Sequence, residues 1–206
     1  MKGSLIVAAM FTVGILVGYF DILPSDIDYA QLALYVLYLL IALVGWEFGY
    51  KQLSVALKEF DRNMIVLPVV TVCGSLGFAA LAGWLLGGYR VQDYVALGSG
   101  LGYYSLSSML ILEYMRPTVG AEIAGELATI ALLANMMREM LALLLSPLLK
   151  RLFGSYAPIS AAGVTSLDVC LPAIARSCGA EMVPMAILHG VILEMSIPVL
   201  VWLCCL

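Results

Sequence analysis

The stretch 157–179, APISAAGVTSLDVCLPAIARSCG, is apolar but is interrupted at its middle by small hydroxyl residues, an acid and a proline. The interruption includes Gly163 and Pro172, and in a helix interior glycine costs about 1 kcal/mol and proline about 3 kcal/mol relative to alanine. We therefore expect the helix to break here. Inside a bilayer a broken backbone is tolerated only where protein or a wet cavity satisfies its free N–H and C=O groups, so the break indicates a site.

The composition of the whole chain is that of an integral membrane protein. The 206 residues are 63% hydrophobic and only 12% charged, and their mean hydropathy is +1.04, whereas soluble domains carry about 25% charged residues. A net charge of −4 and the lack of a basic cluster argue against a nucleic-acid partner. The five cysteines have no C-x-x-C spacing and the chain has one histidine, so we expect free thiols, no metal site and no cofactor.

Five apolar stretches are long enough to cross about 30 Å of hydrocarbon as helices, namely 4–20, 31–49, 64–88, 122–152 and 182–206. A further stretch, 91–115, contains GSGLGYYSLSS at 98–108. Three glycines within five residues make an uninterrupted helix improbable there. The sequence therefore predicts an all-α polytopic membrane protein forming one transporter domain over 1–206, with broken elements at 91–115 and 157–179.

The positive charges favour one of two topologies. If both broken elements cross the membrane, seven spans divide the charges less cleanly. If both are re-entrant hairpins, five spans leave only Arg90 and Arg116 on one side, and the opposite side holds Lys2, Lys51, Lys58, Arg62, Lys150, Arg151 and Arg176. We favour five spans and two oppositely oriented hairpins, with the N-terminus inside and the C-terminus outside. Two broken elements that meet near the midplane are the general layout of secondary transporters.

Acids inside a membrane are costly and are functional candidates by default. Glu47 and Glu126 lie near the ends of their helices, where headgroups or the helix dipole favour them without any function. Glu194 lies midway along the last span and fits a cavity residue or a salt-bridge partner equally well. Glu139 and Asp168 are the stronger candidates because of their neighbours.

Asn135 and Glu139 are four residues apart and share one face of the long helix, with Arg138 beside them. A buried Arg138–Glu139 ion pair is the structural alternative, but adjacent helical residues point about 100° apart, so we expect each to have another partner. Asp168 lies at the break, next to the hydroxyls of Thr165 and Ser166; its structural alternative is an N-cap of the following helix. A lone histidine such as His189 is more often structural than a ligand.

The motifs GSGLGYYSLSS (98–108), ANMMRE (134–139), GVTSLDVCLP (163–172) and MVPMAILHG (182–190) together resemble those of the lysine exporter family LysO, in the same order over essentially the whole chain. The resemblance implies a bacterial inner-membrane exporter of L-lysine and lysine analogues, driven by an H⁺ or Na⁺ gradient. It also implies that Glu139 and Asp168 are the essential intramembrane acids. Family members often begin with about three further spans, so we expect a small membrane subunit to supply them, and a homo-oligomer is possible.

The chemistry of lysine fits these residues, because two ammonium groups and a carboxylate each need a partner out of water. Glu139 and Asp168 would pair with ammonium groups, and protons would compete for the same acids, which is antiport. Helix N-termini and the serines near Ser105 would take the carboxylate. The full set of expected binding residues is Glu139, Asp168, Asn135, Arg138, Ser105, Ser107, Thr165, Ser166, Tyr104 and His189. The alternatives are an assembly subunit and a channel; an enzyme is not expected.

Overall fold

The computed structural model describes residues 13, 14, 16, 17, 19, 20, 35 and 63–206. The chain forms two compact units, Met1–Lys58 and Glu59–Leu206. In the first unit, Tyr19 and Phe20 pack edge to face with ring centroids 5.3 Å apart. The predicted spans 4–20 and 31–49 fall largely outside the described residues, as does Glu47, and a single domain over the whole chain stays a prediction.

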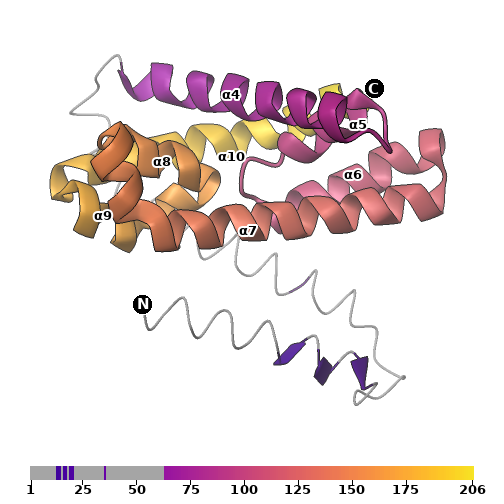
Figure 1. Cartoon of the computed structure of the whole chain (residues 1–206), viewed down its shortest axis with the longest axis horizontal. Helices are drawn as coiled ribbons and strands as arrows, with labels where there is room; N and C mark the ends of the chain where they lie inside the picture. Colours follow the sequence, from indigo (N-terminus) through magenta and orange to yellow (C-terminus); the bar gives the residue numbers. More distant parts are fainter. Residues whose placement is uncertain (1–12, 15, 18, 21–34, 36–62) are drawn as a thin grey trace. The chain divides into compact units, whose positions relative to one another are not determined.

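Three long helices run lengthwise through the second unit (Figure 1): α4 (Asn63–Leu86), α7 (Ala121–Phe153) and α10 (Val183–Cys205). They confirm the helices expected at 64–88, 122–152 and 182–206. Among the described residues, three segments are long and apolar enough to cross a membrane, namely Met64–Leu86, Ala121–Phe153 and Ala180–Cys205. The described part of the chain is helical, without strands, as expected for a polytopic membrane protein.

The first broken element is present as expected: α5 (Val91–Gly98) ends inside the glycine-rich motif and α6 (Tyr104–Val119) begins after it. Between them Leu101 and Gly102 have φ of 47° and 101°, so the backbone leaves the right-handed helical region. Helix α6 continues past Pro117, beyond the predicted end of the element at 115. A proline near the end of a helix removes one hydrogen bond without stopping the final turn.

The second broken element is also present, and it divides into four short pieces. Helix α8 (Tyr156–Ala162) is followed by the 3₁₀ turn η1 (Gly163–Leu167), then α9 (Leu171–Cys178) and a second turn, η2 (Ala180–Met182), which leads into α10. Gly163 has a φ of 66° and ends α8, as glycine commonly does at helix ends. The break therefore falls at Gly163–Asp168, within the Gly163–Pro172 interruption that the sequence indicated, whereas Pro172 itself lies in the first turn of α9.

The two broken elements lie at opposite ends of α7 (Figure 1). Helices α5 and α6 occupy the end where α7 begins, and α8 and α9 occupy the end where it finishes. In each element the chain therefore leaves one end of the unit and returns to it. The breaks meet at the middle, where the Val164 N–H donates a hydrogen bond of 2.9 Å to the Leu101 carbonyl.

A buried apolar cluster fixes the second broken element against the long helices. It joins residues of α8 and α9, and Cys170 just before α9, to α4, α7 and α10. Its buried members are Met64, Ala142, Ile159, Ala162, Cys170, Ile174, Cys178, Met185 and Ala186. Removing apolar area from water stabilises a fold by roughly 25 cal/mol per Å². The helices on both sides of the second break are thus packed against the long helices.

Candidate functional site

Asn135 of α7 holds the first break in place. Its Oδ1 accepts a 2.7 Å hydrogen bond from the Gly102 N–H, and its Nδ2 donates to the Ala131 carbonyl at 2.8 Å. A Cβ on Gly100 would collide with the Asn135 amide and with the Ser107 side chain. Glycine is therefore required at position 100 so that the break can lie against α7.

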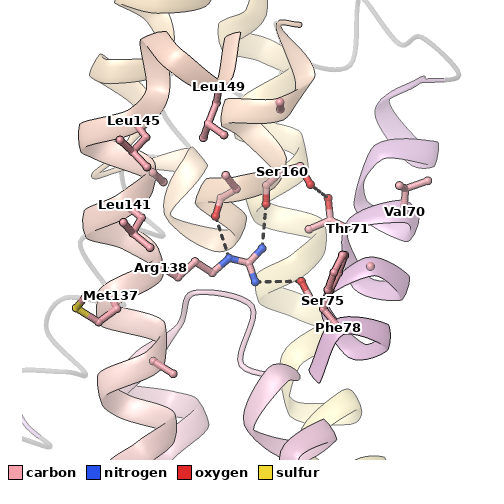
Figure 2. A pocket seen from close by; sticks show the side chains of 15 residues that line it. Val70, Thr71, Ser75, Phe78, Met137, Arg138, Leu141, Leu145, Leu149 and Ser160 are labelled. Atoms are coloured by element: carbon pink, nitrogen blue, oxygen red, sulfur yellow. Dashed lines mark hydrogen bonds between the residues drawn. The ribbon is translucent and has the colours of Figure 1, made fainter. Parts of the chain in front are cut away.

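Arg138, one turn farther along α7, binds the opposite break. Its guanidinium donates to the carbonyls of Ser160 and Ala161 at 2.9 Å each and to the Ser75 hydroxyl of α4 at 3.1 Å (Figure 2). The two carbonyls belong to the last turn of α8, where carbonyl groups lack partners within the helix. The guanidinium faces a cavity of about 750 Å³ between α4, α7 and α8.

Arg138 and Glu139 therefore have separate partners, as the 100° separation of adjacent helical residues predicts. Within residues 63–206 the sole salt bridge joins Arg90 to Asp93, at 2.8 Å. The structural alternative of a buried Arg138–Glu139 pair is accordingly wrong for the described residues. No carboxylate of this part of the chain neutralises Arg138.

Glu139 is 6% exposed and forms no salt bridge with Arg138. Its Oε2 is buried and has no hydrogen-bond partner among the described residues. The Glu139 carbonyl lies 3.9 Å from the Cys170 Sγ, which places this turn of α7 against the second break. A buried carboxylate oxygen without a donor is costly, and such atoms are rare in native proteins, so this position is suited to a cationic ligand or a proton.

Asp168 lies directly after η1 and is exposed, so its carboxylate can reach a ligand. Its Oδ1 accepts a hydrogen bond from the Val169 N–H, and its charge interacts with that of Glu139. The N-cap of α9 is Cys170, with no side-chain capping bond. The alternative role of Asp168 as an N-cap of the following helix is therefore wrong, because the helix starts too late for its carboxylate to cap it.

Thr165, Ser166 and His189 make contacts that hold the second break to its neighbours. Thr165 donates to the Ala162 carbonyl at 3.0 Å and Ser166 to the Ala186 carbonyl at 2.8 Å. The ring of His189, fully buried, lies 3.2 Å from the Ser166 Oγ through Nδ1 and 3.0 Å from the Thr71 Oγ1 of α4 through Nε2. These contacts favour the structural interpretation of His189; ligand roles for the three residues stay predictions.

The hydroxyl residues of the first break are divided between the interior and the surface. Ser107 is fully buried and donates to the Tyr103 carbonyl at 2.7 Å, next to Asn135. Ser105 is half-buried, and Tyr104 is 38% exposed and interacts electrostatically with Glu139 and Asp168. Tyr104 therefore joins the two acids, whereas Ser107 lies on the Asn135 side of the break.

Glu194 of α10 also belongs to this group of acids, and the sequence did not decide its role. It is half-buried, and its charge interacts with that of Asp168. The signal available from the sequence was its spacing from Gly190, because residues four apart share a helix face and Gly190 packs directly on Leu167 and Val164 of η1. Glu126, in contrast, is exposed and accepts a 2.8 Å hydrogen bond from Tyr89. This agrees with the interpretation that Glu126 has no role in binding.

The sequence that forms these two helix breaks matches a known protein family. Residues 8–205 match the family described as lysine exporter LysO. The chain belongs to the LysO family. This confirms the resemblance drawn from the four sequence motifs, and it makes the chain a member of a family of amino-acid transporters of the membrane rather than of an enzyme family.

Two LysO relatives show how much of the chain is shared. Over 167 residues, 81% of this chain, it is 33% identical to lysine exporter LysO of Escherichia coli strain K12 and 30% identical to a protein of Haemophilus influenzae that carries the provisional name of lysine exporter. The matched region is 52% of the Escherichia coli protein and 80% of the Haemophilus influenzae protein. The chain thus spans about half the length of the first relative. No solved structure matches the chain.

Proposed function

We propose that the chain exports L-lysine and lysine analogues across the bacterial inner membrane by antiport, with Glu139 and Asp168 binding the cationic substrate. Both relatives are named as lysine exporters. The observation that carries the proposal is the buried Oε2 of Glu139, which has no hydrogen-bond partner among the described residues, on a turn of α7 whose main chain contacts Cys170 of the second break. An ammonium group or a proton would satisfy that oxygen.

Antiport follows from competition for the same carboxylates. A bound ammonium group stabilises the ionised form of an acid, whereas burial without a cation favours the protonated form. Lysine and protons would therefore replace one another at Glu139 and Asp168. Na⁺ is the other candidate coupling ion, because carboxylate oxygens also bind hard cations.

The test is lysine efflux from loaded proteoliposomes under imposed H⁺ and Na⁺ gradients. We expect efflux to respond to one of the two gradients and to fall at least about a hundredfold in Asp168→Asn and Glu139→Gln. Glu126→Gln is the matched control, because it removes an exposed acid from the same helix as Glu139. Efflux that ignores both gradients would indicate a channel, and normal assembly without any lysine flux would indicate an assembly subunit; either result would end the proposal.

We also propose the topology of five spans and two re-entrant hairpins, with the N-terminus cytoplasmic. The three apolar long helices and the return of each broken element to its own end of the unit support it. In a cysteine-free background, Arg116→Cys should react with an impermeant thiol reagent from outside and Arg151→Cys from inside. Seven full spans require the opposite result at both positions.

The separate subunit with about three N-terminal spans and the homo-oligomer remain proposals that rest on the family resemblance alone. Their test is the transport assay with the purified chain by itself. Lysine efflux by this chain alone, at a rate that a co-expressed neighbouring membrane protein does not raise, would argue against a required subunit. The mass of the detergent-solubilised complex reports the number of copies.

A further inference from the structure

Asp168 lies between two other acids that approach from different helices. Its charge interacts with that of Glu139 from α7 and with that of Glu194 from α10. Glu139 is placed by its contact with Cys170 in the second break, and Glu194 by the face that it shares with Gly190, which packs on Leu167. The three acids therefore form a row with Asp168 in the middle.

Each outer acid of this row has a tyrosine from the start of α6. Tyr104 interacts electrostatically with Glu139 and Asp168, and Tyr103 with Glu194 and Asp168. Both tyrosines are partly exposed, and an aromatic face beside a carboxylate is a favourable place for an ammonium group. The site thus has a Glu139 half (Glu139 and Tyr104) and a Glu194 half (Glu194 and Tyr103), which share Asp168.

An acidic row alone would not indicate a ligand, but in the Glu139 half one carboxylate oxygen lacks a hydrogen-bond donor within residues 63–206. Glu139 is 6% exposed, and its Oε2 has no hydrogen-bond donor in the described part of the chain. The nearby cation cannot fill this role, because the guanidinium of Arg138 is bound to two carbonyls of α8 and to Ser75. An ammonium group of a bound substrate, or a proton on the carboxyl itself, would satisfy this oxygen.

We propose that the two halves bind the two ammonium groups of one substrate molecule, so that the site selects compounds with two amino groups. This inference rests on the proposed function and adds Glu194 and Tyr103 to the substrate-binding residues. Lysine has an α-ammonium and a side-chain ammonium, and each would have its own outer acid, while Asp168 faces both. A compound with one ammonium group would leave one half empty, and its desolvated carboxylate would have no partner.

The test compares two probes, cadaverine and norleucine, as competitors of lysine transport and as ligands that raise the unfolding temperature of the detergent-solubilised chain. Cadaverine has both amino groups but no carboxylate, and norleucine has the carboxylate but lacks the side-chain amine. We expect cadaverine, and not norleucine, to compete with lysine and to stabilise the chain. In Glu194→Gln the KM for lysine should rise at least about tenfold, and cadaverine should lose its advantage over norleucine.

Glu113→Gln is the control, because it removes an exposed acid from α6 and should leave both measurements unchanged. Glu194→Asp retains the charge and should keep the preference for diamines, even if Glu194→Gln folds poorly. Lysine transport with an unaltered KM and probe preference in Glu194→Gln would overturn this inference and leave the proposed function intact. A wild-type chain that neither transports nor binds lysine would overturn both.

Discussion

The backbone N–H of Val164 donates a 2.9 Å hydrogen bond to the carbonyl of Leu101, although 63 positions separate the two residues along the chain. Each residue lies in one of the two helix breaks, so this bond joins the elements that enter from opposite ends of α7. Alternating access in transporters with such elements requires one repeat or bundle to move against the other. A movement of one broken element against the other would change the geometry of this Leu101–Val164 hydrogen bond.

Gly163→Ala tests how closely the breaks must approach. A Cβ at Gly163 would collide with the carbonyl oxygen of Leu101, in addition to the strain of its φ of 66°. We expect the variant to lose more than the roughly 1–2 kcal/mol that left-handed strain alone costs, measured by thermal unfolding in detergent. Gly87→Ala is the matched control, because its φ is 64° and its Cβ would meet open space. Equal losses in the two variants would show that the close approach is unimportant.

Asn135→Ala removes the acceptor of the Gly102 N–H and should destabilise the chain by about 1–3 kcal/mol, because a buried donor is left without a partner. Thr129→Ala serves for comparison, since Thr129 also bonds the carbonyl four residues earlier on α7 but lies on the exposed face. We expect that change to stay within about 0.5 kcal/mol. Similar unfolding temperatures for both variants would mean that Asn135 does not hold the first break.

Arg138→Met leaves the Ser160 and Ala161 carbonyls without their donor, and we expect a loss of at least about 2 kcal/mol. Arg138→Lys should recover only part of it, because one ammonium group lacks the planar fork that reaches α4 and α8 together. Arg151→Met, at the exposed end of α7, is the control. Full stability in Arg138→Met would contradict this structural role, and it would indicate that the guanidinium is not needed to hold α8 and α4 together.

His189→Leu tests the structural role of the buried ring. The change removes one hydrogen-bond partner each from Thr71 and Ser166, so we expect stability to fall by about 1–3 kcal/mol. The pH dependence of lysine efflux should keep its shape, because a neutral ring fixed between two hydroxyls carries no transported proton. A shifted pH profile in a variant of normal stability would instead assign His189 to proton transfer.

The helix breaks could be predicted because their cause is local. Gly98, Gly100 and Gly102, and the segment from Gly163 to Pro172, are poor helix formers wherever they occur, and the structure breaks at both places. The long helices were equally predictable, because uninterrupted apolar runs leave no other fold in a membrane. The extension of α6 past Pro117 was not, because proline in a last turn weakens a helix without fixing its end.

Contacts between distant segments could not be read from the sequence. The i, i+4 spacing placed Asn135 and Glu139 on one face, but nothing in it told that Asn135 would bind the first break and Glu139 would face the second. Two partners of Arg138 are main-chain carbonyls. Every residue carries such a group, so residue types could not identify these partners. Glu194 joins Asp168 only through the packing of α10 on η1, and that packing depends on the whole fold.

Main-chain oxygens at the end of α8 hold Arg138, so this permanent cation leaves the three carboxylates of the row unneutralised. If lysine leaves the row as proposed, three ionised carboxylates without a cation would repel one another inside the bilayer, so protons or other cations have to replace lysine. The substrate-free transporter could then return to its starting conformation only after binding other cations. Electrostatic repulsion, rather than a separate gate, would thus suppress lysine flux without exchange.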